Sequence, residues 1–192
     1  MTLVSLFGRP GSGKTTIGAA LADRHGFLHL PLGVLLKDPE IVKQIGIDAD
    51  AMAEAIKSGR TVNDPALYPW LDNQVRSHRK VVVDGYPRGV TSLDPYAQLI
   101  ETLPSTRSVL ALHLDCTALV ANARLKLRAR SDDDERLHSR HDEYERVQLP
   151  MLASLPSRVH VSHVDASGDP DTVYGAVEAA LGFAARALRG AT

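Results

Sequence analysis

Short hydrophobic runs alternate with longer amphipathic stretches along the chain, and this alternation predicts parallel strands joined by crossover helices. Five runs rich in Val and Leu have the length of strands, and the third is apolar without interruption, as in a strand buried on both faces of a sheet. The predicted strands are Leu3–Phe7, Phe27–Leu30, Val81–Val83, Val109–Leu114 and Val159–Val164.

Helical periodicity fills the intervals between these runs. A first helix is expected over Gly13–His25 and a last one over about Pro170–Leu188, where apolar residues recur at helical spacing. Residues 31–80, about fifty in all, have the pattern of several helices punctuated by Pro and Gly, without a strand. This segment is too long for one crossover and predicts a helical insert above the sheet. A short polar break is expected at about 129–135.

Composition narrows the class of protein. The 192 residues suit one domain, and 44% apolar with 23% charged residues is close to the globular average. A formal net charge of −1 gives no reason to expect a nucleic-acid or membrane partner. Cys116 is the only cysteine, and no apolar run reaches membrane-spanning length. The opening TLVSLFG is too short for a signal peptide, so we expect a soluble cytoplasmic protein.

Residues 8–15 read GRPGSGKT and match the phosphate-binding pattern GxxxxGK[ST] at every fixed position. The context also fits, because a predicted strand precedes the motif and a predicted helix follows it. Glycines let the backbone curl so that successive N–H groups face one concavity, and the helix N-terminus adds its dipole there. Lys14 is expected to reach the β- and γ-phosphates of a nucleotide, and the Thr15 hydroxyl to hold Mg²⁺.

A second motif follows the third predicted strand at the same edge of the sheet. Asp84 comes directly after a hydrophobic run, where P-loop proteins place the carboxylate that organises Mg²⁺. Gly85 permits a close backbone approach, and Arg88 can grip a phosphate with two parallel hydrogen bonds. The sequence therefore predicts that Thr15 and Asp84 form a metal site.

The run VVVDGYPR resembles the [LIV]DG[FY]PR signature of adenylate kinases and their uridylate–cytidylate relatives. An arginine cluster is similar to the same family's R-x3-R, R-x-D-D and R-x3-Y pattern, and the resemblance covers nearly the whole chain. It implies a three-layer α/β P-loop NTPase fold, with a five-stranded parallel sheet, helices on both faces, a helical monophosphate-binding insert (about 31–80) and a very short lid (about 129–135) in a single domain. It also implies ATP and Mg²⁺, nucleotide substrates and a monomer.

The resemblance implies that the γ-phosphoryl group of ATP passes in line to a nucleoside monophosphate, AMP or a related nucleotide, without a covalent intermediate. Positioning and positive charge would supply the catalysis. The implied catalytic residues are Lys14, Arg88, Arg128, Arg130 and Arg140. The implied ATP-binding residues are Gly8, Pro10, Gly11, Ser12, Gly13, Lys14, Thr15, Thr16, Arg124 and Arg128. The implied acceptor-binding residues are Leu32, Gly33, Lys37, Arg60, Val62, Gly85, Arg88 and Ser92.

The chain departs from the family pattern at the acceptor side and at the lid. Leu32 stands where the family has threonine, Lys37 where it has arginine, and Ser92 where it has the glutamine that reads adenine. A site that loses such partners changes its selectivity. Only Ala129 separates Arg128 from Arg130, so the lid is shorter than the short family lids and would exclude water less completely.

Two other functions stay open on the sequence. A small-metabolite kinase of the shikimate or gluconate type is favoured by Thr15, because the adenylate family usually has glycine there. A nucleotide-binding module with little turnover is favoured by the altered acceptor positions and the minimal lid. The intact DGYPR motif opposes the first of these, and the retained Lys14 and Arg88 oppose the second.

Overall fold

The computed structural model describes residues 1–57, 64–127 and 140–187. Its centre is a sheet of five parallel strands in the order β2-β3-β1-β4-β5, so the first strand of the chain lies in the middle. The strands are β1 Thr2–Phe7, β2 Leu28–Pro31, β3 Lys80–Asp84, β4 Ser108–Asp115 and β5 His160–Asp165. The loop that follows β1 is therefore flanked by the loops that follow β3 and β4, at the edge where open α/β sheets bind ligands.

Successive strand residues point to opposite faces of the sheet, and in this protein both faces are covered. On β3, Val81 and Val83 join one hydrophobic core, whereas Val82 joins the other. In register, Val4 of β1 lies beside Val82 and belongs to the same core. The uninterrupted apolar run of β3 follows from this double burial, because neither face of the strand meets water.

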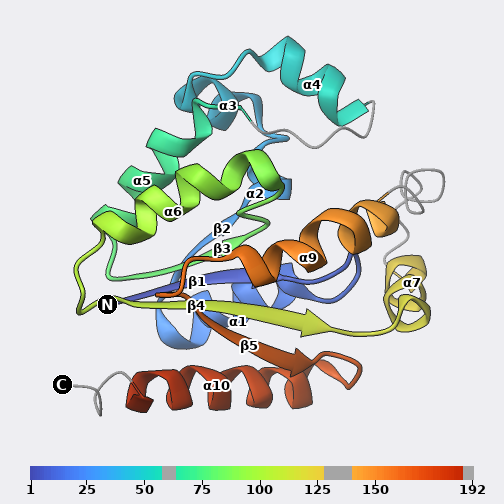
Figure 1. Ribbon diagram of the computed structural model, residues 1–192. Helices are drawn as coiled ribbons and strands as arrows, with labels where there is room; N and C mark the ends of the chain where they lie inside the picture. Colours follow the sequence, from blue (N-terminus) through green and yellow to red (C-terminus); the bar gives the residue numbers. More distant parts are fainter. Residues whose placement is uncertain (58–63, 128–139, 188–192) are drawn as a thin grey trace.

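Helices form a layer on each side of the sheet (Figure 1). One layer contains α5, α6 and α9 with the more distant α2 to α4, and it encloses the first core. The other contains α1 and α10 and encloses the second core, while α7 stands at the carboxyl end of the strands. The helices are α1 Lys14–His25, α2 Leu32–Leu35, α3 Pro39–Ile45, α4 Ala49–Lys57, α5 Leu67–Ser77, η1 Val90–Ser92, α6 Leu93–Thr102, α7 Ala118–Leu127, η2 Tyr144–Gln148, α9 Leu149–Met151, η3 Leu152–Ser154 and α10 Pro170–Ala187.

This architecture confirms the predicted three-layer α/β fold with five parallel strands. Each predicted strand overlaps an observed one, and no end differs by more than one residue. Four helices, α2 to α5, occupy the described part of the segment between β2 and β3, as the pattern of Pro and Gly predicted. The predicted lid at 129–135 lies outside the described residues.

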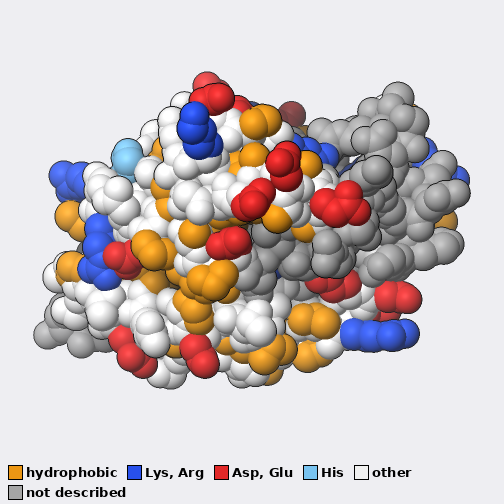
Figure 2. Space-filling model, turned by 90° about the horizontal axis from the view of Figure 1, so that it is seen from above, with side chains coloured by type: hydrophobic (Ala, Val, Ile, Leu, Met, Phe, Trp, Pro, Cys, Tyr) orange, Lys and Arg blue, Asp and Glu red, His pale blue; other side chains and the backbone are white. Residues whose placement is uncertain are grey.

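Charge and hydrophobicity are mixed on the face that the α2 to α6 layer presents. Seen from above, acidic and hydrophobic side chains are intermingled among the described residues of this face (Figure 2). None of the described helices combines the length and the apolar character that crossing a bilayer demands. Two cations that matter for the site below, Lys14 and Arg88, are partly buried at the carboxyl ends of the strands.

Candidate phosphoryl-transfer site

The loop between β1 and α1 bends as a phosphate cradle, which we define as residues 8–15. Gly11 has φ +85° and Gly13 has φ +97°, a backbone region that L side chains rarely adopt. A Cβ at Gly11 would lie 2.5 Å from the carbonyl oxygen of Ala121 in α7, whereas a Cβ at Gly13 would meet nothing within 4 Å. Gly11 is therefore required by both conformation and packing, and Gly13 by conformation alone.

The Lys14 side chain folds back over the residues of the cradle that precede it. Its Nζ donates to the carbonyl oxygens of Gly8 at 2.6 Å and Arg9 at 3.1 Å. Ser12 Oγ is buried and has no hydrogen-bond partner among the described residues. An unpaired buried hydroxyl costs free energy unless a ligand satisfies it. The cradle thus combines an ammonium group, an unused hydroxyl and the start of α1, all of which suit phosphate oxygens.

Thr15 and Asp84 meet beside the cradle. Thr15 Oγ1 donates to Asp84 Oδ2 at 2.6 Å, although the two residues belong to different strand–helix junctions. Hydroxyl and carboxylate oxygens are the ligands that Mg²⁺ prefers, with the remaining positions filled by water and phosphate. The described residues contain no group of three or more His, Cys, Asp and Glu that could hold a metal unaided. The donor set therefore fits Mg²⁺ held jointly with a phosphorylated ligand.

Arg88 is presented by a tight turn after β3. The turn contains a cis peptide bond between Tyr86 and Pro87, and Gly85 has φ +89°. Ser92 Oγ accepts from the backbone N–H groups of Arg88 at 2.9 Å and Gly89 at 3.1 Å, and donates to the carbonyl oxygen of Gly89 at 2.7 Å. The serine thus holds the backbone that carries the Arg88 guanidinium.

Three cations and two carboxylates influence one another across the site. Burial lowers the pKa of Lys14, and the charges of Arg140 and Arg88 lower it further, while Asp84 opposes them. Burial likewise lowers the pKa of Arg88, with Arg140 acting in the same direction and Glu143 and Asp84 against it. Positive charge is therefore concentrated in partly desolvated surroundings, which favours a polyanionic ligand.

Two of the residues predicted to bind the acceptor have buried side chains. Leu32 is fully buried in the first core, and Ser92 is fully buried with its hydroxyl engaged in the turn after Arg88. A side-chain contact from either residue to a ligand would require this packing to open. Gly33 and Lys37, in contrast, are exposed around α2. Their contacts with an acceptor stay predictions.

Arg124, predicted to serve ATP, is anchored to the loop after β5. Its Nη1 donates to the carbonyl oxygen of Ala166 at 2.7 Å and its Nη2 to that of Gly168 at 2.5 Å. It therefore fixes the position of this loop relative to α7. Pro10 lies in the cradle and Thr16 directly follows it, and their contacts with ATP stay predictions. Four predicted site residues lie outside the described residues: Arg60, Val62, Arg128 and Arg130.

Sequence reasoning missed a contact of the cradle with a helix far along the chain. The Arg9 guanidinium lies over the ring of Tyr144, with Cζ 5.0 Å from the ring centroid, and its Nη1 is 3.3 Å from Glu145 Oε1. Arg9 occupies a variable position of the GxxxxGK[ST] pattern, so the motif itself carries no signal for this contact.

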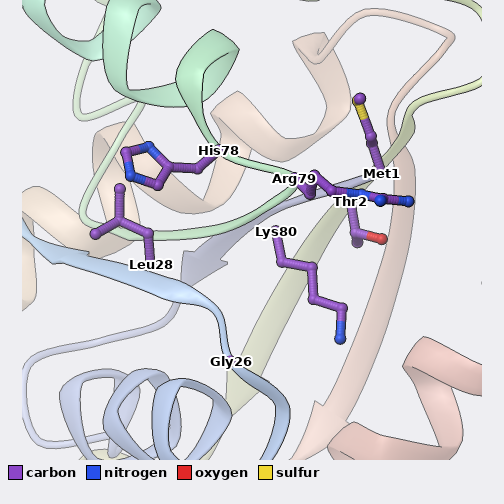
Figure 3. A pocket seen from close by; sticks show the side chains of 7 residues that line it. All are labelled: Met1, Thr2, Gly26, Leu28, His78, Arg79 and Lys80. Carbon is purple, nitrogen blue, oxygen red and sulfur yellow. The ribbon is translucent and has the colours of Figure 1, made fainter.

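A hollow of about 350 Å³ lies at the opposite end of the strands from the cradle, where β1, β2 and β3 begin (Figure 3). Its basic side chains are largely engaged: Lys80 Nζ donates to the carbonyl oxygen of His25 at 2.8 Å, and His78 Nδ1 lies 2.9 Å from that of Gln74. The phosphate cradle, with its unpaired hydroxyl and clustered cations, is the better candidate for an active site.

The fold and this cradle define a P-loop nucleotide-binding protein. A sequence model of the AAA domain family matches residues 7–140, from the end of β1 to Arg140. The adenylate kinase of Synechococcus sp. (strain RCC307) is 30% identical over 178 residues, which cover 91% of this chain and 95% of that protein. The adenylate kinase of Thermus thermophilus is 28% identical over 184 residues, covering 94% and 97%. The UMP-CMP kinase 1 of Oryza sativa subsp. japonica is 27% identical over 184 residues, covering 93% and 73%.

The chain belongs to the nucleoside monophosphate kinase family of P-loop enzymes, and it is a kinase. The predicted family is therefore confirmed.

Proposed function

We propose that this kinase transfers the γ-phosphoryl group of ATP to a nucleoside monophosphate, AMP or a related ribo- or deoxyribonucleotide, in a Mg²⁺-dependent reaction. The products are ADP and a nucleoside diphosphate. The observation that carries the proposal is the convergence of Lys14, Arg88 and Arg140 on one partly buried site beside the Thr15–Asp84 pair.

The cradle supplies the binding of the triphosphate. Backbone N–H groups of the loop and the start of α1 attract phosphate oxygens, and the buried Ser12 hydroxyl gains a partner. Lys14 exchanges its bonds to the loop carbonyls for bonds to the β- and γ-phosphates. Positioning of this kind removes the entropic part of the barrier before the reaction begins.

Transfer spreads negative charge over the oxygens of the moving group, and fixed cations stabilise that charge. Lys14 approaches it from the ATP side, Arg88 from the acceptor side and Arg140 from the helix that follows the lid. Mg²⁺, held by Thr15 and Asp84, would offset charge on the β- and γ-phosphates. Arg128 and Arg130 are proposed to complete the cluster on the basis of the family pattern alone.

Departures at the acceptor side argue for testing several bases. The Ser92 hydroxyl already makes hydrogen bonds within its own turn. It therefore does not replace the family glutamine that hydrogen-bonds adenine. Lys37 supplies charge without the two-pronged geometry of arginine. We therefore expect the acceptor to be held mainly through its phosphate, by Arg88.

A coupled assay of ADP formation tests the proposal. ATP and Mg²⁺ are offered with a panel of ribo- and deoxyribonucleoside monophosphates, and with shikimate and gluconate. Turnover of at least one monophosphate supports the proposed function, and the ranking identifies the base. Turnover of a sugar acid alone identifies a small-metabolite kinase instead. ATP binding without consumption of any acceptor contradicts the proposed reaction.

A further inference from the structure

The side chain of Arg9, in the loop between β1 and α1, does not extend into solvent. Its side chain is only 12% exposed, and its guanidinium lies over the ring of Tyr144 and forms an ion pair with the carboxylate of Glu145. Arg9 Nε is buried and has no hydrogen-bond partner among the described residues. Within the described part of the chain, two partners of the Arg9 guanidinium, Tyr144 and Glu145, are neighbours on one helical segment.

The backbone of Arg9 links this anchored side chain to the chemistry of the cradle. Its carbonyl oxygen accepts from Lys14 Nζ at 3.1 Å and from the N–H of Ser12 at 3.0 Å. A displacement of Arg9 would move an acceptor that shapes the loop and orients the lysine ammonium. The anchor of Arg9 thus bears on the binding of phosphate.

Tyr144 contacts His113, which in turn contacts His163. The Tyr144 side chain is buried, and its hydroxyl oxygen lies 2.5 Å from His113 Nε2, on β4. His113 Nδ1 lies 3.0 Å from His163 Nδ1, on the neighbouring strand β5. A continuous line of polar contacts therefore leads from the outer strand of the sheet to the phosphate cradle.

The contact between Tyr144 and His113 is a hydrogen bond in either tautomer of the imidazole. The Tyr144 hydroxyl donates when His113 Nε2 is unprotonated, and its oxygen accepts when Nε2 carries a proton. Burial lowers the pKa of His113, and the charges of His163, Arg9 and Lys14 act in the same direction, against Asp115. The ring of Tyr144 is therefore held from the side of β4 whichever of the two groups donates.

The helix widens where Tyr144 stands. Residues Tyr144–Gln148 form a π-helical turn, a rare feature that is frequent at functional sites. Pro150 explains the widening, because it lacks an N–H group and its ring crowds the carbonyl of Arg146 one turn earlier. Arg140 precedes Tyr144 by four residues, so the contact of Tyr144 also sets the helical turn that carries a cation of the site.

We propose that Tyr144 is a positioning residue of the phosphate cradle, acting through Arg9: its ring and its bond to His113 hold the loop in the form that binds triphosphate. The inference rests on the proposed function, because it assumes that the cradle binds ATP. Tyr144 itself touches no reacting atom.

Two variants of Tyr144 test the idea by calorimetric titration with ATP in the absence of acceptor. Tyr144→Phe keeps the ring under Arg9 and loses the hydroxyl, and we expect the Kd for ATP to rise about three- to tenfold, the loss typical of one hydrogen bond. Tyr144→Leu loses the stacked ring as well and should bind more weakly still. Tyr174→Phe is the matched control, because Tyr174 also lies beneath an arginine, with Arg24 Cζ 4.2 Å from its ring centroid, at the far end of α1. It should bind ATP as the wild type does.

A double-mutant cycle separates positioning from a general loss of stability. Tyr144→Leu is combined with Arg9→Ala, and the Kd for ATP is measured for the wild type, both single variants and the double variant. Because Tyr144 acts through Arg9, we expect Tyr144→Leu to raise the Kd much less in the Arg9→Ala background than in the wild type. A loss of stability that does not pass through Arg9 would raise the Kd by the same factor in both backgrounds.

Wild-type affinity in both Tyr144→Phe and Tyr144→Leu would overturn the inference, as would a rise in Kd that is the same with and without Arg9. If Tyr144→Leu fails to fold, the cycle is run with Tyr144→Phe in its place. A wild type that does not bind ATP would overturn the proposed function, and that result is distinct from a wild type that binds ATP and is unaffected by Tyr144→Phe.

Discussion

Thr15 Oγ1 donates a hydrogen bond of 2.6 Å to Asp84 Oδ2, joining the start of α1 to the end of β3. Parallel strands with both faces buried leave their carboxyl ends as the place where polar groups can meet. Two oxygens held this close can serve one metal ion without moving either strand.

Replacing Asp84 by Asn keeps the size of the side chain and removes its charge. We expect the concentration of Mg²⁺ needed for half-maximal transfer to rise about 10- to 100-fold, the loss typical of a disturbed metal environment. A Mg²⁺ titration of the coupled assay measures it. Chelation with EDTA should stop the wild type and excess Mg²⁺ should restore it; an unchanged Mg²⁺ requirement in Asp84→Asn would remove Asp84 from the metal site.

Lys14→Met should separate activity from stability. We expect kcat/KM to fall at least about 10²- to 10³-fold, because a fixed cation is lost from the transition state. The folded protein should be no less stable, since burial and the neighbouring arginines disfavour the charged form of Lys14. ADP formation and the free energy of unfolding in urea measure the two effects. Activity near that of the wild type would refute the role of the cradle.

Gly11→Ala and Gly13→Ala form a matched pair in the cradle. Both place a side chain at positive φ, at a cost of about 1–2 kcal/mol each. Only at Gly11 does the new Cβ also collide with the backbone oxygen of Ala121. We expect Gly11→Ala to lower the free energy of unfolding by at least about 1 kcal/mol more, by comparison with overpacked cores. Equal unfolding midpoints in denaturant would contradict the packing of α7 on the loop.

Ser92→Ala should act on the turn that presents Arg88. The change leaves the backbone N–H groups of Arg88 and Gly89 without their acceptor, so we expect a loss of about 1–3 kcal/mol in the free energy of unfolding. The KM for the acceptor should rise while that for ATP stays the same. Initial-rate kinetics with each substrate varied in turn checks this split, and a rise in the KM for ATP alone would be evidence against it.

His113 makes stability dependent on pH. Its pKa is lowered in the folded chain by burial, so the unfolded chain binds a proton more readily. The contribution of His113 is therefore complete above the ordinary histidine pKa of about 6.5 and is lost as the pH falls toward the folded value. We expect the free energy of unfolding to decline in acid, and the decline to be shallower in His113→Gln. His29, whose pKa burial also lowers, accounts for part of the remaining slope.

The strands and the cradle could be predicted because their signals are local. A continuous run such as Val81–Val83 is enough by itself to indicate a buried parallel strand. The GxxxxGK[ST] pattern likewise predicts a phosphate-binding loop from eight consecutive residues. The pairing of Thr15 with Asp84 was also within reach, since strand ends of a parallel sheet lie at one edge.

The roles of Ser92 and Arg9 were out of reach for the opposite reason. Ser92 was expected to face the acceptor because of its position in a family pattern, but the turn from Arg88 directs its hydroxyl inward. Arg9 and Tyr144 are 135 residues apart, and nothing near either one indicates that they meet. Such contacts depend on how the helical segment at residues 140–154 packs over the sheet, which no local spacing determines.

The separation of the two hydrophobic cores has a consequence for how this enzyme can change. Ile17 and Ala121, which support the cradle, pack in the core on the α1 and α10 side, whereas Leu32 and Leu36 pack in the core on the opposite face of the sheet. Substitutions that reshape one compartment are screened from the other by the strands between them. If the proposed function holds, substitutions around Leu32 and Leu36 can alter the choice of acceptor while the packing that supports the phosphate cradle stays unchanged.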